Sequence, residues 1–334
     1  MKMEVKDKLG RGLRDLRISV TDKCNFRCRY CMPAEVFGPG YAFLPKGELL
    51  SFEEIIRLVR ITVPMGVGKI RLTGGEPLLR RGIADLIAMI SAIEGVEDIA
   101  MTTNGVLLAH HSEELALAGL NRVTVSLDAL DPVIFGKMNG TGAKVERVVS
   151  GIMTAKTFGL PVKVNAVIQR GVNEGEILPL ARWAKNAGVD LRFIEYMDVG
   201  ETNGWDMSQV VTGAEIMEIL STEFQLSPRA AAYRGEVAVN WQHDNSTEEI
   251  GLIQSVSAPF CSDCQRMRLS ADGKLFTCLF AAEGHDIRSI LRSDQPQETI
   301  TRAIRDIWTS REDRYSELRG KVAMKKAEMS YLGG

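Results

Sequence analysis

The first two-thirds of the chain repeats one pattern, a short strand followed by a helix. Runs rich in β-branched residues alternate with amphipathic stretches of helical period. This alternation predicts a parallel sheet whose strands are joined by right-handed crossovers. The predicted strands are Leu16–Val20, Lys69–Thr73, Ile99–Thr103, Arg122–Leu127, Val162–Ile168 and Leu191–Met197. The predicted helices are Ser51–Val63, Gly82–Ile93, Ser112–Ala118, Val145–Phe158 and Glu176–Ala187.

The number of these units indicates the kind of sheet. Six strands fall short of the eight that close a complete (β/α)₈ barrel. We therefore predict an α/β fold built on an open, incomplete (β/α)₆ TIM-like barrel. The helix at Ser51–Val63 has the clearest start, because Ser51 and Glu54 have the spacing of a capping box.

Beyond about Thr222 the pattern changes to antiparallel strands followed by short helices. The strands are expected to end in a hairpin that turns at residues 271–274. The predicted elements are strands at Tyr233–Gln242, Ile250–Ser257 and Met267–Phe280, and helices near Asp286–Arg292 and Glu298–Thr309. No linker rich in Gly, Ser or Pro separates the two parts. We therefore divide the chain into a partial barrel at residues 1–222 and a C-terminal antiparallel extension at residues 223–334, which packs on the barrel and covers its open side.

The chain is nearly neutral, with a net charge of −2 and a mean hydropathy of −0.04. Such a chain has no general electrostatic hold on nucleic acid or on an anionic membrane. Its N-terminal residues are too charged for a signal peptide, and no apolar run is long enough to span a bilayer. We therefore expect a cytoplasmic protein that binds neither nucleic acid nor a membrane.

The six cysteines are grouped rather than scattered. They form two triplets, Cys24, Cys28, Cys31 and Cys261, Cys264, Cys278. Disulfides are rare in a reducing cytoplasm, and each triplet would leave an odd cysteine. The grouping therefore predicts two metal centres.

The first triplet has the spacing C-x-x-x-C-x-x-C and directly follows the first predicted strand. Parallel barrels carry their chemistry at the C-terminal ends of the strands, where this loop would lie. Three thiolates can bind three irons of a [4Fe–4S] cube and leave the fourth iron open to a substrate. The spacing alone also allows a zinc site with a remote fourth ligand.

The second predicted strand, Lys69–Thr73, runs into Gly74-Gly75-Glu76-Pro77. Paired glycines let a backbone approach a ligand closely, and a carboxylate accepts hydrogen bonds from an amino group. Together with the cysteine loop, this element resembles the radical S-adenosylmethionine superfamily. The resemblance implies that the first triplet holds a [4Fe–4S] cluster that cleaves S-adenosylmethionine, and that Tyr30 packs near the adenine.

The second triplet has the spacing C-x₂-C-x₁₃-C across the predicted hairpin. It fits either a Cys₃His zinc site, with His285 or His243 as fourth ligand, or an auxiliary iron–sulfur cluster. Arg266 and Arg268 alternate around Met267, so both guanidinium groups would face one side of a strand, beside the metal. Two arginines in that place are hard to explain by structure alone.

Several motifs together are similar to those of the GTP 3′,8-cyclases of molybdenum-cofactor biosynthesis, the MoaA family. They include T-D-K-C-N-F-R-C-R-Y-C-M-P, R-L-T-G-G-E-P-L-L-R, F-I-E-Y-M-D-V-G and C-S-D-C-Q-R-M-R-L-S, and the match runs from about Leu13 to the final Gly-Gly. The resemblance implies a lyase that cyclises GTP, with two [4Fe–4S] clusters and S-adenosylmethionine as cofactors. It also implies a cytosolic electron donor, a downstream cyclic pyranopterin monophosphate synthase and a homodimer.

Basic residues on the predicted strands support a polyanionic ligand independently. A nucleoside triphosphate carries about four negative charges, which a near-neutral protein neutralises with charge-assisted hydrogen bonds. A Lys or Arg within a parallel strand is unusual, because such strands are normally buried on both faces. The candidates are Arg17, Lys69, Arg71, Lys163, Arg192, Arg266 and Arg268.

The resemblance assigns ligands residue by residue. The first triplet would hold the cluster that binds S-adenosylmethionine, and the second triplet the cluster that binds GTP. Positions that match contacts to GTP are Arg17, Arg71, Thr102, Lys163, Arg266, Met267 and Arg268. Positions that match contacts to S-adenosylmethionine are Tyr30, Gly75, Ser126 and Met197. The terminal Gly333 and Gly334 would reach into the active site and be needed for turnover.

Two other functions remain open on the sequence. A radical enzyme that matures a peptide also carries auxiliary clusters, but such enzymes usually have more than three C-terminal cysteines and need no phosphate-binding arginines. A non-enzymatic zinc-binding protein would hold zinc in both triplets.

Overall fold

Parallel strands form an open barrel, as the sequence predicts. The computed structural model describes residues 4–320 and 325–333. The barrel strands are β1 Asp15–Ser19, β2 Lys69–Thr73, β3 Asp98–Thr103, β4 Arg122–Ser126, β5 Val162–Ile168 and β6 Asp190–Glu195. Each of them pairs in parallel with the next in the chain, so β1 and β6 are the two edges of this part of the sheet.

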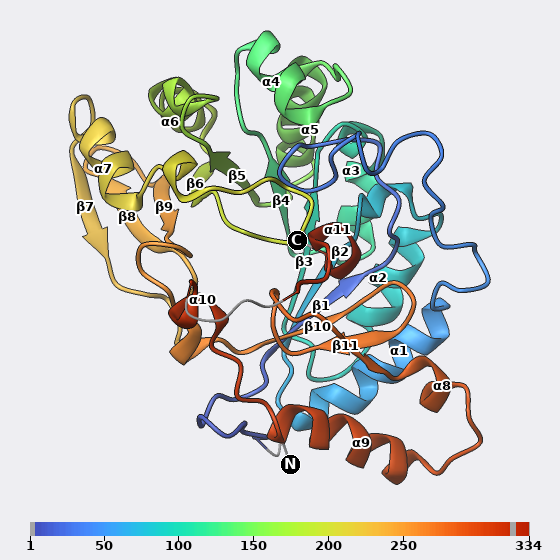
Figure 1. Cartoon of the computed structure of the whole chain (residues 1–334). Coiled ribbons are helices and arrows are strands. Elements are labelled where there is room, and N and C mark those ends of the chain that lie inside the picture. The colour runs from blue at the N-terminus through green and yellow to red at the C-terminus, as the bar shows by residue number, and fades with distance from the viewer. Residues whose placement is uncertain (1–3, 321–324, 334) are drawn as a thin grey trace.

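The C-terminal extension continues the same sheet at both edges (Figure 1). Its strands are β7 Leu226–Arg229, β8 Val239–His243, β9 Glu249–Ile253, β10 Arg266–Leu269, β11 Lys274–Phe276 and β12 His285–Asp286. β9 runs parallel to β6 and β10 runs parallel to β1, whereas the outer strands pair antiparallel. The resulting 12-stranded sheet has the order β12-β11-β10-β1-β2-β3-β4-β5-β6-β9-β8-β7. The predicted antiparallel extension is therefore present, and parallel pairs join it to the barrel.

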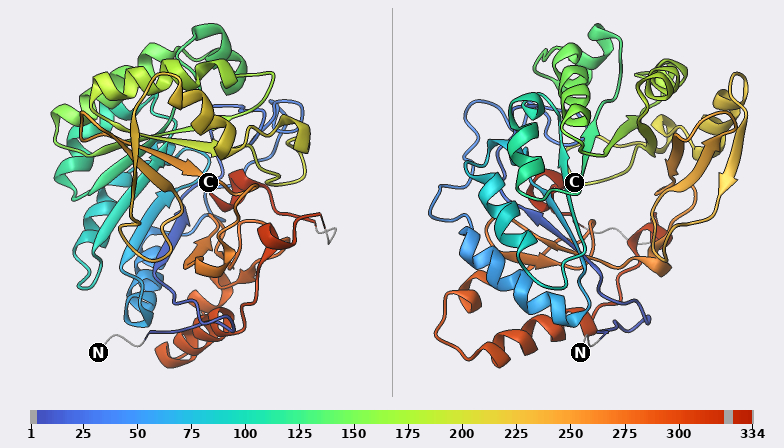
Figure 2. Two further views of the ribbon diagram at one scale, coloured as in Figure 1. Left: turned by 90° about the vertical axis from the view of Figure 1, so that its left-hand side faces the viewer. Right: turned by 180° about the vertical axis from the view of Figure 1, so that it is seen from behind.

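Helices cover the outside of the barrel (Figure 2). They are α1 Phe52–Thr62, α2 Ile83–Ser91, α3 Leu108–Leu117, α4 Pro132–Asn139, α5 Val145–Thr157, α6 Ile177–Ala187 and α7 Gly213–Ser221. The C-terminal helices are α8 Arg288–Leu291, α9 Gln297–Thr309, α10 Tyr315–Leu318 and α11 Met329–Leu332. The capping box of α1 is confirmed: Ser51 Oγ accepts from Glu54 N at 3.2 Å, and the Glu54 carboxylate accepts from Ser51 N at 2.7 Å. Among the described residues, none of the helices has the length and apolar character that a bilayer crossing needs.

The structure differs from the predicted elements in several places. α3 begins at Leu108 rather than Ser112, and α4 and α7 were not predicted. The predicted strand Tyr233–Gln242 is too long, since β8 begins only at Val239. Its first part is a loop because tertiary contacts hold it: the Lys69 ammonium donates to the Tyr233 hydroxyl at 2.9 Å, and Arg234 pairs with Asp263.

Side chains along the barrel strands alternate between the outer core and the interior. Leu16 and Ile18 on β1 are fully buried in the core, as are Ile70 and Leu72 on β2. The intervening Arg17 and Arg71 instead line the interior cavity. This alternation places cations where an α/β barrel carries its chemistry.

Candidate functional site

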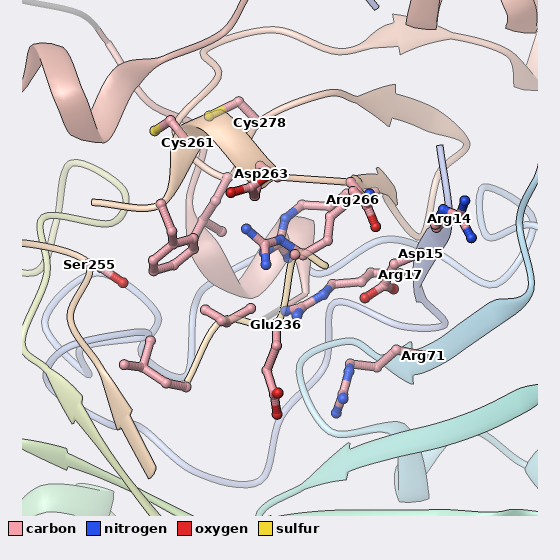
Figure 3. Close-up of a pocket in the computed structure, with 18 of the residues that line it drawn as sticks. Arg14, Asp15, Arg17, Arg71, Glu236, Ser255, Cys261, Asp263, Arg266 and Cys278 are labelled. Atoms are coloured by element: carbon pink, nitrogen blue, oxygen red, sulfur yellow. The ribbon is translucent and has the colours of Figure 1, made fainter. Parts of the chain in front are cut away.

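The open barrel encloses one large cavity of about 910 Å³. Its wall is made by inward-facing strand residues, by the loop before β8 and by the turn that carries the second cysteine triplet (Figure 3). The predicted site residues on this wall are Arg17, Tyr30, Lys69, Arg71, Thr102, Ser126, Arg192, Met197, Cys261, Cys264, Arg266, Arg268 and Cys278. The fold therefore brings together residues that lie as far apart in the sequence as Arg17 and Cys278.

A row of arginines crosses three neighbouring strands at one level. In the strand register Arg268 of β10 stands opposite Arg17 of β1, and Arg17 stands opposite Arg71 of β2. Arg266 is next along β10, and Arg192 lines the cavity from β6. We call these five residues the arginine row. Arg192 is its distal member, because it lies on β6 rather than on β10, β1 or β2.

Burial and repulsion by neighbouring arginines act on four members of the arginine row, Arg17, Arg71, Arg192 and Arg268. Burial, followed by the charge of Arg17, lowers the pKa of Arg71 to about 9, and burial with the charges of Arg17 and Arg266 does the same for Arg268. Burial also lowers the pKa values of Arg17 and Arg192. Among the described residues none of these guanidinium groups has a carboxylate within salt-bridge distance. A buried cluster of unpaired cations is costly, and a polyanionic ligand would relieve that cost.

Arg71 is positioned by hydroxyl groups rather than by an acid. Its Nη1 donates to Thr102 Oγ1 at 3.0 Å and to Thr124 Oγ1 at 3.2 Å. Its Nε is buried without a hydrogen-bond partner in the described part of the chain. Thr102 therefore has a positioning contact to a predicted ligand residue, besides its own place on the cavity wall.

A ring of ion pairs lies at the opposite, N-terminal ends of the strands. Lys69 lies 3.7 Å from Asp98, and Arg122 contacts the same carboxylate at 2.5 Å. Lys163 pairs with Asp190 at 2.9 Å. Of these cations, Lys69 and Arg122 line the cavity, whereas Lys163 is not on its wall. A ligand that used Lys163 would have to compete with Asp190.

The first cysteine loop follows β1 and is fastened to the turn after β2. Gly75 N donates to Thr21 O at 2.7 Å, and Glu76 N donates to Lys23 O at 2.8 Å. A Cβ at Gly75 would lie 2.4 Å from Lys23 O, so only glycine allows the two backbones to approach this closely.

Glu76, a potential acceptor for an amino group, is already engaged. Its Oε1 accepts from Leu78 N at 3.0 Å and from Thr103 Oγ1 at 2.7 Å, and its Oε2 accepts from Asn104 N at 2.7 Å. Burial raises the pKa of this carboxyl. In this structure Glu76 therefore fastens the turn after β2 to the end of β3.

The thiols of the first triplet fit an iron–sulfur cluster. All three are free cysteines in one tight turn, where Cys31 N donates to Cys28 O at 3.0 Å. Burial raises the pKa of Cys24 to about 11, and burial and the neighbouring charges raise those of Cys28 and Cys31 further. Phe26 N points at the Cys24 sulfur, 3.4 Å away. A bound metal lowers the pKa of the thiols that it ligates, so these three half-buried cysteines can serve as thiolate ligands.

Tyr30, between two of these cysteines, ties the loop to the middle of the barrel. Its hydroxyl donates to Asp128 Oδ2 at 2.7 Å, and Asp128 Oδ1 accepts from Val167 N at 2.9 Å. Tyr30 and Ser126 line the cavity, and so does Met197 just beyond β6. The Met197 carbonyl accepts from Asn203 Nδ2 at 3.1 Å and from Val199 N at 2.9 Å.

The second triplet lies on the cavity wall beside the arginine row (Figure 3). Burial acts to raise the pKa of Cys264, but the charges of Arg266 and Arg311 outweigh it and lower that pKa to about 6. Burial raises the pKa of Cys278 to about 12. Three free cysteines on one wall supply the thiolate donors that an iron–sulfur cluster requires, so this triplet also fits such a cluster.

Neither histidine proposed as a fourth zinc ligand lies on this wall. His243 is in β8, where its ring packs against Phe224 with the centroids 5.1 Å apart. His285 is exposed on β12. Over residues 4–320 and 325–333, no three His, Cys, Asp or Glu side chains converge as a site for one metal ion. A cube in which each thiolate binds its own iron does not need that convergence.

The C-terminal segment enters the site beneath the first cysteine loop. The Arg268 guanidinium donates to the Gly333 carbonyl, and Tyr331 donates to Asp272 Oδ1 at 2.6 Å. A Cβ at Gly333 would lie 2.4 Å from Thr73 Cγ2, at the end of β2. Gly334 lies outside the described residues. Met267, by contrast, has its side chain in the core on the opposite face of β10.

Sequence reasoning missed several residues of this site. Asp128 lies two residues beyond Ser126, which ends β4, and this closeness to a predicted site residue could have identified it. Arg122 starts a predicted strand and so had the same signal as the other basic candidates. No sequence signal pointed to Arg11 or Arg311, because they meet the second triplet only through tertiary contacts.

Comparison with known families and proteins covers both halves of the chain. The pattern of the Radical SAM superfamily matches residues 18–184, and that of Molybdenum Cofactor Synthesis C matches residues 189–317. The chain is 48% identical over 340 residues to the GTP 3′,8-cyclase of Staphylococcus haemolyticus, with 100% of each chain covered. It is 48% identical over 362 residues to the GTP 3′,8-cyclase of Acidothermus cellulolyticus, again with 100% of each covered.

Solved structures of lower identity share the fold. Streptococcus suis SuiB bound to S-adenosylmethionine superposes with a TM-score of 0.63 at 16% identity, covering 91% of this chain and 67% of that one. Methylornithine synthase superposes with a TM-score of 0.50 at 17% identity, covering 63% and 62%. These similarities confirm the predicted partial barrel.

Proposed function

The chain belongs to the GTP 3′,8-cyclase family of the radical S-adenosylmethionine superfamily, and from this premise we propose that it converts GTP to (8S)-3′,8-cyclo-7,8-dihydroguanosine 5′-triphosphate. The reaction joins C3′ of the ribose to C8 of the guanine. When bound, a [4Fe–4S] cluster and S-adenosylmethionine supply the radical chemistry that starts it. The product is an intermediate of molybdenum-cofactor biosynthesis.

The arginine row is the observation that carries the proposal. GTP brings about four negative charges, and the cavity offers guanidinium groups that have no acidic partner among the described residues. Arg268, Arg17 and Arg71 lie side by side in the register, so adjacent phosphate and ribose oxygens can be bound along one line. The chain itself thus binds and orients the nucleotide.

The second triplet is proposed to hold a second [4Fe–4S] cluster against the guanine. The position of all three cysteines on the cavity wall beside Arg266 supports this assignment. Tyr30, Gly75, Ser126 and Met197 would contact S-adenosylmethionine, at the same mouth of the barrel as the first triplet. The C-terminal tail, which ends against Arg268, would help to exclude water from the reacting atoms.

The remaining details of the function rest on the family resemblance. We assign the reaction to the lyases and propose a cytosolic electron donor. We further propose that a cyclic pyranopterin monophosphate synthase consumes the product, and that the enzyme is a homodimer.

The test is an anaerobic assay of the reconstituted protein with S-adenosylmethionine, a reductant and GTP. We expect 5′-deoxyadenosine and a cyclised nucleotide, and we expect Cys28→Ser to form neither, because the first cluster loses a ligand. If 5′-deoxyadenosine forms equally with and without GTP and no cyclised nucleotide appears, the substrate is another molecule. Zinc in both triplets, with no acid-labile sulfide, would contradict the radical chemistry itself.

A further inference from the structure

The N-terminal segment folds into a small hairpin that presents Arg11 to the interior. Lys6 and Gly12 form an antiparallel bridge, and Asp7 Oδ1 accepts from Arg11 N at 2.9 Å. The hairpin lies against the end of α9, at the lower end of the molecule in both views of Figure 2. There Trp308 Nε1 donates to Arg11 O at 3.1 Å.

One buried carboxylate joins two arginines in this region. Asp7 Oδ2 lies 2.6 Å from Arg11 Nε and 3.2 Å from Arg311 Nη1. The three side chains are between 0% and 1% exposed. Asp313, whose side chain is 31% exposed, is a second carboxylate partner, with its Oδ2 3.5 Å from Arg311 Nε. Of the two carboxylates that face these guanidinium groups, only Asp7 is shielded from water.

Both arginines hold the turn that carries the second cysteine triplet. Arg11 Nη1 donates to Cys261 O at 2.8 Å and to Asp313 O at 2.8 Å, and Arg311 Nη1 donates to Cys264 O at 2.7 Å. Two cysteine carbonyls are thus fixed by guanidinium groups from opposite ends of the chain. We call Asp7, Arg11 and Arg311 the clamp. The turn that contains Cys261 and Cys264 depends on the clamp for its shape.

The clamp also has two N–H donors that form no hydrogen bond with the residues that the structure describes. Arg11 Nη2 and Arg311 Nε are buried and have no hydrogen-bond partner within the described ranges. A buried N–H donor without a hydrogen bond favours an anionic group beside it.

We propose that Arg11 and Arg311, joined by Asp7, are positioning residues for the second iron–sulfur cluster and make that cluster easier to reduce. They fix the Cys261–Cys264 turn through its carbonyls and so hold two guanidinium groups within hydrogen-bond distance of the backbone of two cluster ligands. Positive charge and hydrogen bonding near the sulfurs stabilise the reduced, more negative state of a cluster. The inference rests on the proposed function, because it requires that the second triplet holds a cluster.

The experiment measures the reduction potentials of both clusters in the reconstituted full chain by paramagnetic resonance. The signal that changes when S-adenosylmethionine is added identifies the first cluster, which serves as an internal reference. In Arg311→Gln we expect the potential of the second cluster to shift to more negative values while the first stays unchanged. Arg311→Lys, which keeps the charge, should recover most of the shift. The surface variant Arg182→Gln, whose residue pairs with Glu223 far from the cavity wall, should change neither.

Each other outcome also decides the question. An unchanged second potential in Arg311→Gln, with both clusters present, overturns the proposal. If that variant loses the iron of the second cluster while its metal-free form keeps the wild-type melting temperature, the clamp holds the cluster, and recovery of that iron in Arg311→Lys is expected. If Arg311→Gln does not fold, Arg11→Gln, which also removes a positive charge, is measured in the same way, with the same expected shift. A wild-type chain that binds about four irons instead of about eight would refute the second cluster itself, before any variant is compared.

Discussion

Arg268 is the residue at which several parts of the molecule meet. Its strand position places it beside Arg17, and its guanidinium donates to the carbonyl of Gly333 in the C-terminal segment. Burial and the charges of Arg17 and Arg266 lower its pKa to about 9. An anionic ligand bound here would stabilise the charged form and contact the same guanidinium that holds the tail.

Replacing both Arg266 and Arg268 with alanine should weaken GTP binding. A hydrogen bond to a charged group contributes about 1.5–3 kcal/mol, so we expect a loss of roughly 10- to 100-fold for each arginine. Cleavage of S-adenosylmethionine without ring closure should continue, because the first triplet lies on another loop. Equilibrium binding of GTP and production of 5′-deoxyadenosine are the two measurements. Arg182→Ala is the control, and wild-type affinity in the double variant would remove both arginines from the nucleotide site.

His243 should make the stability of the fold depend on pH. Its side chain is buried at 3% exposure, and burial, followed by the charge of Lys185, lowers its pKa below the unfolded value of 6.5. The folded state therefore binds fewer protons, so this contribution to stability is complete above about pH 6.5 and is lost as the pH falls through the lowered pKa.

The prediction is tested by urea unfolding of the metal-free protein between about pH 7.5 and about pH 5. The free energy of unfolding of the wild type should fall relative to that of His243→Gln as the pH is lowered. The exposed His110→Gln should follow the wild type at every pH. If the free energy of unfolding has the same pH dependence in the wild type and in His243→Gln, the histidine has the same pKa in the folded and unfolded states, and the prediction is wrong.

At the scale of elements, local signals identified one helix and one turn that are closed by their own neighbours in the sequence. The capping box at Ser51 predicted α1 correctly, and Gly273, with a φ of 88°, makes the predicted hairpin turn. The same kind of signal was present for the unpredicted helices: Asp131 caps α4 ahead of Pro132, and Thr212 begins a capping box at α7. The loop before β8 had no such signal, because distant residues hold it.

The C-terminal tail gives a prediction about an element. Gly333 has a φ of +75°, and a Cβ there would overlap Thr73 Cγ2. Gly333→Ala should therefore displace the tail from Arg268 and lower ring closure at least about tenfold, which corresponds to about 1.4 kcal/mol. Binding of S-adenosylmethionine should be retained. Gly171→Ala, at a φ of +74° with no atom within 4 Å of the added Cβ, tests the backbone effect alone. Equal loss in the two variants would remove the tail contact as the cause.

For the whole molecule, the continuous 12-stranded sheet makes the extension part of the barrel's stability. Without residues 223–334, β1 would lose β10 and β6 would lose β9. Both edges would then expose unpaired backbone groups, and such edges promote aggregation. We expect residues 1–222 alone to be insoluble, and the full chain to unfold in urea in one transition. Size-exclusion chromatography of the fragment is the measurement, and a soluble, cooperatively folded fragment would show that the barrel is independent.

The sequence by itself determined the barrel strands, the two cysteine groups and the arginines that are proposed to bind GTP. It could do so because alternation along a strand and spacing within a loop are local properties of the chain. Only the tertiary structure decided that Arg268, Arg17 and Arg71 stand side by side, and that Lys163 pairs with Asp190 away from the cavity wall. It also decided that Arg11 and Arg311 meet at one carboxylate. Register between distant strands and the burial of a charge depend on the packing of the whole sheet, which no local pattern encodes.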